Sequence, residues 1–302
     1  FSDLVALLSG RNFATRDYEA DISVKSFQLL SKGLLDFVNQ TNYQRFIMLV
    51  QSIGFINNKL ISSKNSLNFS YALYLKLRDE GMPESEVQHY VKRWLVLSLL
   101  IGRYSGSSES MIDEDIKQIN EKGIATYLQQ MERTYLGEGF WDFALVSDLE
   151  TTSVNNNAYN VYLAVQCATN KTAFLSKSMK INSLIEQRGD IHHIFPKKYL
   201  TDNGYSRRQY NQVANFVYTE QATNIKVGKL APKDYMNKVI TEIKDNTFNI
   251  STIDSNDILE MNLEDNDIPQ YIMEADTSNY NSFLEDRRKL MAQKIKAFYL
   301  EL

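Results

Sequence analysis

The stretch Asp190-Ile191-His192-His193-Ile194-Phe195-Pro196 decides how this sequence is interpreted, because it holds two of the three histidines among 302 residues. Histidine is the side chain best suited to proton transfer near neutral pH and to metal ligation. Two adjacent imidazoles can divide these tasks, so that one binds a cation while its neighbour activates water. A histidine pair alone also fits a structural or surface role, and the flanking sequence has to decide between these interpretations.

A second stretch downstream carries two asparagines nine residues apart. It reads Asn215-Phe216-Val217-Tyr218-Thr219-Glu220-Gln221-Ala222-Thr223-Asn224. The aromatic and β-branched residues that follow its first asparagine favour a short strand. Thr219 is suited to N-cap a short helix and Gly228 to end it, so Asn224 is expected within that helix. Pro196 is expected to end the strand that carries the histidines. The predicted order is therefore strand, loop, strand and helix.

This order and spacing resembles the HNH nucleases, also called the His-Me finger or ββα-metal group, over about residues 186–230. The resemblance implies that His193, which stands directly before Ile-Phe-Pro, is the general base. It also implies that His192 and the helical Asn224 are metal ligands, and that Asn215 buttresses the loop and orients the base. Many members carry aspartate where His192 stands, and this departure leaves the identity of the metal open.

The expected cofactor is one divalent cation. Asp190 is a further candidate ligand, or a partner for an imidazole, because residues two apart on a strand face the same side. Having only two protein ligands fits Mg²⁺, which keeps several waters, while the imidazole also allows Mn²⁺, Ni²⁺ or Zn²⁺. A structural zinc site is a poorer alternative, because such sites commonly use thiolates and the chain has a single cysteine, Cys167.

Positive charge gathers around the same motif. Residues 171–240 hold 12 Lys or Arg and 5 Asp or Glu, whereas residues 241–302 hold 6 and 13, in a chain whose net charge is −4. A solvated charged face would also explain this pattern. On the nuclease hypothesis, the basic side chains beside the motif would hold backbone phosphates and make binding salt-dependent; these are Lys197, Lys198, Arg207, Arg208, Lys226 and Lys229.

Two outer segments look like parts of the GmrSD-type restriction proteins. They are Arg103-Tyr104-Ser105-Gly106-Ser107-Ser108-Glu109-Ser110 and Arg287-Arg288-Lys289-Leu290-Met291. Those are modification-dependent DNA endonucleases of phage defence, so the resemblance implies DNA, possibly modified, as the partner. It also implies an N-terminal nucleotide-binding domain or subunit. The chain opens at Phe1 and has no phosphate-cradling glycine-rich loop, so we expect that part upstream. Arg103 is a candidate DNA contact, or only a cap for a helix C-terminus.

Composition favours long helices over a β-sandwich or barrel, because only 4 prolines and 12 glycines interrupt the chain. Apolar residues at steps of three, four and, once, seven predict helices with one buried face at 24–38, 87–101 and 284–302. The asparagine-rich residues 151–160 predict a domain boundary or a long loop. The longest apolar stretch, 94–101, is far shorter than the roughly 18 residues of a membrane span, and a cytoplasmic protein is expected.

We therefore expect a mainly α protein, a helical scaffold with a small embedded ββα-metal (HNH) finger. The expected division is a helical domain at 1–150, a linker or helical connection at 151–185, the finger at 186–230 and a helical region at 231–302 packed on it. The expected activity is metal-dependent hydrolysis of DNA in restriction and antiviral defence. The alternatives are a non-catalytic nucleic-acid-binding or interaction module with a degenerate HNH fold, and a nuclease that acts on RNA.

Overall fold

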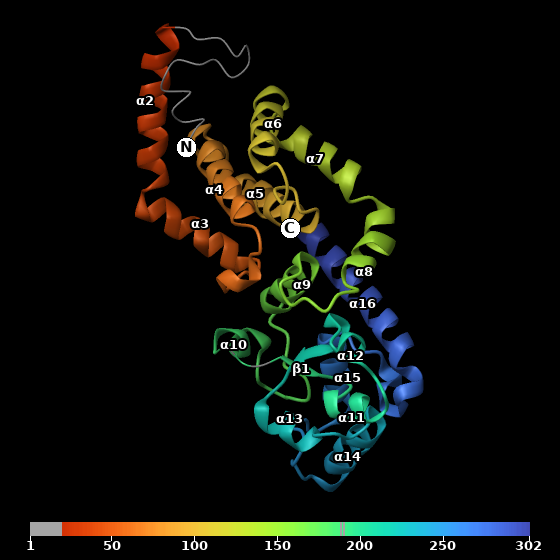
Figure 1. Cartoon of the computed structure of the whole chain (residues 1–302). Coiled ribbons are helices and arrows are strands. Elements are labelled where there is room, and N and C mark those ends of the chain that lie inside the picture. The colour runs from red at the N-terminus through yellow and green to blue at the C-terminus, as the bar shows by residue number, and fades with distance from the viewer. Residues whose placement is uncertain (1–19, 188, 190) are drawn as a thin grey trace.

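The computed structural model describes residues 20–187, 189 and 191–302, and these residues are mostly helical, as the composition predicts. Figure 1 shows an elongated molecule with a lobe at each end. One end, here called the helical lobe, contains α2 (Ala20–Phe37), α3 (Gln40–Ser52), η1 (Asn58–Leu60), α4 (Lys64–Asp79), α5 (Glu84–Leu100), α6 (Ser108–Lys122), α7 (Ile124–Tyr135), the π-helix η2 (Phe140–Ala144) and α8 (Leu145–Asp148).

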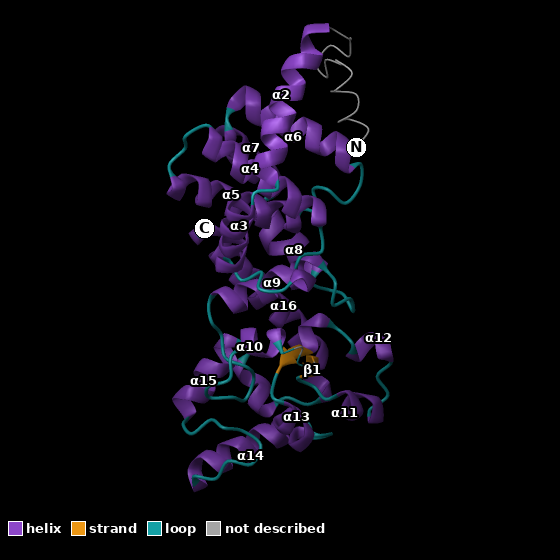
Figure 2. Cartoon of the chain, turned by 90° about the vertical axis from the view of Figure 1, so that its left-hand side faces the viewer, coloured by secondary structure: helices purple, strands orange, loops and turns teal. Residues whose placement is uncertain are grey.

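The other end, here called the strand lobe, contains both strands that the structure describes (Figure 2). Its elements are α10 (Ile181–Glu186), β1 (Ile191–His193), α11 (Lys197–Asp202), α12 (Arg207–Tyr210), η3 (Val213–Asn215), β2 (Phe216–Tyr218), α13 (Gln221–Val227), α14 (Pro232–Asp245), α15 (Asn256–Asp265), η4 (Gln270–Glu274) and η5 (Thr277–Asn279). Two helices, α9 (Asn157–Ala168) and α16 (Tyr280–Glu301), run between the lobes.

The core of the helical lobe is built around α5, which packs against α4, α7 and α9. Pro83 precedes the helix, and Glu84 and Glu86 in its first turn favour the positive end of the helix dipole. The predicted face is buried, with Val87 and Trp94 both 0% exposed. From Trp94 to Leu100 every residue is buried, so the helix is surrounded on all sides.

The prediction for α2 is wrong in one respect. The helix forms, but the apolar stripe expected to be buried is open to solvent where its side chains are described, with Phe27 61%, Leu34 57% and Val38 65% exposed. Figure 1 shows α2 at the edge of the molecule, where α3 and α4 are its neighbours. Periodicity predicted the helix, but it does not reveal whether another element covers the apolar face.

The connecting helix α9 begins inside the stretch expected to be a loop. Only residues 151–156 precede it, and the Asn156 side chain accepts a hydrogen bond from Tyr159 N at 2.9 Å, which caps the helix. Residues Ala158 to Cys167 are all buried. The asparagines here therefore mark the start of a core helix. The second connecting helix, α16, packs against α8 and α9, and the predicted closing helix is confirmed.

The two strands pair antiparallel, with Ile191 opposite Tyr218, His192 opposite Val217 and His193 opposite Phe216. Both lie where the sequence predicts them, and α13 follows with Asn224 inside it. The expected cap is wrong, because α13 begins at Gln221 and the Thr219 hydroxyl instead donates to Phe174 O at 2.6 Å. No helix in the described ranges is long and apolar enough to cross a membrane.

Candidate active site around His193

The β1 strand places two imidazoles side by side in sequence but on opposite faces of the ladder, as neighbours on a strand must be. The His193 ring lies against two aromatic rings, edge-on to Phe216 at 5.1 Å between centroids and near Tyr210 at 6.1 Å. Both histidine side chains are half-buried. The aromatic walls restrict the rotation of His193 and remove part of its hydration.

One polar side chain touches the His193 ring directly. Nε2 of His193 lies 3.1 Å from Oδ1 of Asn211, which follows the last residue of α12. With the amide oxygen as acceptor, Nε2 carries the hydrogen and the lone pair is left on Nδ1. The sequence interpretation missed Asn211, because no motif distinguishes an asparagine at the end of a four-residue helix.

Its surroundings hold the pKa of His193 below its usual value of 6.5. Burial is the main cause, and the nearby Lys197 and His192 act in the same direction, while the hydrogen bond with Asn211 opposes them. The Lys197 ammonium is kept nearby by the Tyr210 ring, whose centroid is 5.7 Å from Nζ. A lowered pKa favours the neutral imidazole, the form that can accept a proton.

Asn215 is fully buried, and its side chain holds backbone groups. Its Oδ1 accepts from Phe195 N at 2.8 Å, and its Nδ2 donates to the carbonyl oxygens of Phe195 and Tyr210, each at 3.1 Å. These contacts tie the loop after the histidines to the backbone of Tyr210, while the role of Asn215 in catalysis stays a prediction. The direct side-chain contact with the imidazole comes from Asn211.

The candidate metal ligands come from two elements. His192 lies on β1 and Asn224, partly exposed, on α13, while Asp190 falls outside the described residues. Within the described part of the chain, no cluster of three or more His, Cys, Asp or Glu side chains is arranged to hold a metal. One imidazole and one amide would leave most of a coordination sphere to water and phosphate, and this donor set fits a largely hydrated divalent cation.

The basic residues near the motif differ in how they are engaged. Lys198 forms an exposed ion pair with Asp202 at 2.5 Å, and Lys226 donates to the carbonyl oxygen of Asn249. The remaining four are exposed and form no ion pair with any residue that the structure describes; they are Lys197, Arg207, Arg208 and Lys229. Exposed cations of this kind suit phosphate contacts without sequence preference.

Arg103 lies in the helical lobe and is committed to a buried carboxylate. Its Nη2 is 2.7 Å from Oδ1 of Asp115, a residue 0% exposed that also accepts hydrogen bonds from Tyr104 and Tyr127. The Arg103 side chain is only 10% exposed. This placement favours the structural alternative for Arg103, although neutralising a carboxylate is a different task from capping a helix.

Comparison with known proteins adds little about activity. No protein-family model matches the chain, and no solved structure matches it. An uncharacterized protein of Methanocaldococcus jannaschii is 24% identical over 317 aligned positions, which cover 98% of this chain and 51% of that protein. The chain thus spans about half the length of the curated relative it matches, and the name of that relative states no activity.

Proposed function

We propose that this chain is a metal-dependent HNH endonuclease that hydrolyses DNA phosphodiester bonds, with β1, β2 and α13 as its ββα-metal finger. The observation that carries the proposal is the environment of His193. Its imidazole is desolvated, bonded to Asn211 at 3.1 Å and placed at the end of a strand whose following loop is fixed by Asn215. A neutral, immobilised imidazole is what a general base for water requires.

In this mechanism His193 takes the proton of the attacking water. Because its Nε2 faces Asn211, Nδ1 is the nitrogen that receives the proton. Lys197 lies near enough to lower the pKa of His193, and the same ammonium can hold a phosphate beside the ring. His192 and Asn224, with Asp190 as a further candidate, would hold a divalent cation, most simply Mg²⁺, which when bound supplies charge neutralisation at the phosphate and the leaving oxygen.

The biological setting we propose is restriction or antiviral defence in the cytoplasm. It depends on the two outer segments that look like GmrSD-type proteins, and it places a nucleotide-binding domain or subunit upstream. Modified DNA is the substrate that this resemblance suggests. The exposed cations at Lys197, Arg207, Arg208 and Lys229 support a polyanionic partner of either kind, DNA or RNA.

Plasmid cleavage at low salt tests the proposal. The unmodified protein is incubated with Mg²⁺, Mn²⁺ or Ni²⁺ and with EDTA, beside His193→Ala and a matched control, His89→Ala. His89 is an exposed histidine of α5, and its Nδ1 lies near the last carbonyl of the chain. We expect metal-dependent nicking that His193→Ala loses and His89→Ala keeps.

Two results would count against the proposal. Equal nicking by His193→Ala would place the base elsewhere or reveal a contaminant. Binding of DNA without cleavage in any metal, also after the upstream part and a nucleotide are added, would support the non-catalytic alternative. A labelled RNA in the same assay separates the RNase alternative, because an RNase would cut it while leaving the plasmid intact.

A further inference from the structure

The β1–β2 ladder is too small to be stable by itself. Each strand has three residues, and an isolated two-stranded ladder is at best marginal in water. One edge of β2 pairs with β1, so the carbonyl oxygens on its other edge need donors of their own. Tyr218 O accepts from Phe174 N at 2.9 Å, while Phe216 O accepts from the guanidinium of Arg287 at 2.7 Å.

Arg287 comes from α16, 71 residues further along the chain than Phe216. Its side chain is 1% exposed, and the hydrogen bonds recorded for it all go to main-chain oxygens. Nη1 donates to Ala214 O at 2.8 Å as well as to Phe216 O, and Nε and Nη2 donate to Asn266 O at 3.3 and 3.0 Å. The planar fork thus joins β2 to the turn that follows α15.

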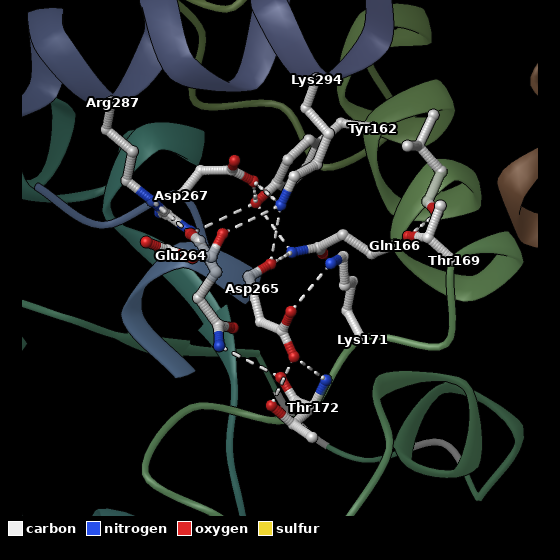
Figure 3. Close-up of polar contacts among 12 residues, drawn as sticks. Tyr162, Gln166, Thr169, Lys171, Thr172, Glu264, Asp265, Asp267, Arg287 and Lys294 are labelled. Atoms are coloured by element: carbon white, nitrogen blue, oxygen red, sulfur yellow. Dashed lines mark hydrogen bonds and ion pairs between the residues drawn. The ribbon is translucent and has the colours of Figure 1, made fainter. Parts of the chain in front are cut away.

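That turn is itself fixed to α16 at a second point. Figure 3 shows Arg287 and Lys294 reaching from the same helix toward the turn. Lys294 Nζ lies 2.9 Å from Asp265 O and 2.7 Å from Oδ2 of Asp267. Tyr162 and Gln166 of α9 complete the network, since the Tyr162 hydroxyl donates to Asp267 at 2.8 Å. The guanidinium is therefore held by a rigid frame of two long helices.

Two of the three carbonyl oxygens that Arg287 bonds, those of Ala214 and Phe216, flank Asn215. On the opposite side of this residue, its own carbonyl accepts from Ile194 N at 2.9 Å, and its side chain holds Phe195. The ring of Phe216 supports the His193 imidazole edge-on. Moving the carbonyls of Ala214 and Phe216 would therefore move both the loop after the histidines and the surface against which the base lies.

We infer that Arg287 is a positioning residue for His193, and this inference rests on the proposed nuclease function. Its guanidinium takes the place of a third strand along the outer edge of β2, and so fixes the backbone from Ala214 to Phe216 relative to α16. A base displaced by about 1 Å can cost on the order of a hundredfold in rate. Arg287 acts through Asn215 and Phe216, without contact with the substrate.

The test compares Arg287→Lys with a control, Arg288→Lys. The first keeps a positive charge on a flexible side chain but loses the planar guanidinium that bonds three carbonyl oxygens at once. Arg288 is the next residue of the helix and forms an ion pair with Glu150 at 3.6 Å, outside this frame. We expect kcat for nicking to fall by about tenfold or more in Arg287→Lys with KM unchanged, the pattern of a disturbed catalytic geometry, and neither to change in Arg288→Lys.

Amide hydrogen exchange supplies a measurement that needs no nuclease activity. The Ile194 and Phe195 amides, both bonded to Asn215, should exchange at least about tenfold faster in Arg287→Lys, relative to the amides of α5 in the same sample. A residue that only stabilises the fold would raise exchange in α5 and at Ile194 alike. Uniform exchange, or an unchanged kcat, would overturn the inference.

If Arg287→Lys does not fold, NMR of the unmodified protein tests the inference. NMR should then show slow rotation and slow exchange of the guanidinium protons of Arg287, with contacts to Phe216. A freely rotating guanidinium would overturn the inference. If the unmodified protein does not cut DNA or RNA, the proposed function has failed, whereas the exchange of Ile194 and Phe195 still reports whether Arg287 holds the loop.

Discussion

The central helix α5 of the helical lobe and the short elements of the strand lobe are held in place by different kinds of contact. In the helical lobe, α5 is surrounded by apolar side chains, and its stability comes from many small, interchangeable burials. In the strand lobe, short elements are held by single polar side chains that bond main-chain groups, such as Asn215, Arg287 and Glu242, whose carboxylate accepts from the amides of Asn249 and Ile250. Apolar contacts accept other apolar side chains of similar volume, whereas the hydrogen bonds to main-chain groups require one geometry.

The largest difference between the two kinds of contact is expected for two truncations, Asn215→Ala and Leu97→Ala. Removing the Asn215 amide leaves Phe195 N and two carbonyls without partners in a buried site, which costs about 2–4 kcal/mol of stability. It should also lower kcat for nicking by on the order of a hundredfold, because the loop beside His193 loses the hydrogen bonds that hold Phe195 in place. Leu97→Ala should cost about 2–5 kcal/mol and leave kcat unchanged while the protein stays folded.

Thermal unfolding and single-turnover nicking at low temperature measure the two effects separately. Leu97 is 0% exposed and lies in the helical lobe, so it matches Asn215 in burial but not in position. The comparison fails if both variants lose kcat in proportion to their loss of stability. It also fails if Asn215→Ala remains as active as the unmodified protein.

Features that are local in the sequence could be predicted, whereas features that depend on how distant elements pack could not. The period of the apolar residues predicted α5 and α16, because a buried helical face repeats its pattern locally. It was wrong about the burial of α2, since the covering element is a property of the whole fold. The second strand and the position of Asn224 in α13 were predicted from the strand-favouring residues 216–218 and from Gly228 as a helix end, which are signals local in the sequence.

The residues that sequence reasoning missed act over long separations. Asn211 reaches His193 across 18 residues, and Arg287 reaches Ala214 across 73. Neither contact leaves a periodic or local signal, because a single hydrogen bond depends on how the elements pack. Arg287 was singled out only as part of a loosely matching segment, and no sequence pattern indicates that its side chain is buried.

A smaller effect concerns the pH dependence of the strand lobe. Burial by itself raises the pKa of Asp265, but the amide and hydroxyl of Thr172, at 3.0 and 2.8 Å, and the ammonium of Lys171 outweigh it and lower the pKa below 3.8. A carboxyl group whose pKa is lower in the folded state than in the unfolded state stabilises the protein at pH values above its pKa in the unfolded state. This contribution is lost as the pH falls through its pKa in the folded state.

We therefore expect Asp265→Asn to lower the free energy of unfolding by about 1–2 kcal/mol at pH 7. The difference from the unmodified protein should shrink as the pH falls below 3.8 toward the folded pKa. Denaturant titrations at a series of pH values measure this. Asp113→Asn, which changes an exposed carboxylate of the helical lobe, should leave the stability curve as it is. A deficit for Asp265→Asn that persists undiminished in acid would contradict the assignment.

The weakest effect expected is on DNA binding by exposed arginines of the strand lobe. Arg207 and Arg208 begin α12 and are exposed, so replacing either with alanine should leave stability nearly unchanged. If each holds one phosphate, its loss should weaken binding of duplex DNA a few-fold and reduce the slope of log affinity against log salt by about 1. Lys117→Ala, an exposed cation on α6 of the helical lobe, should change neither. Fluorescence anisotropy at several salt concentrations measures both quantities, and an equal change of slope in Lys117→Ala would mean that DNA binding is not confined to the strand lobe.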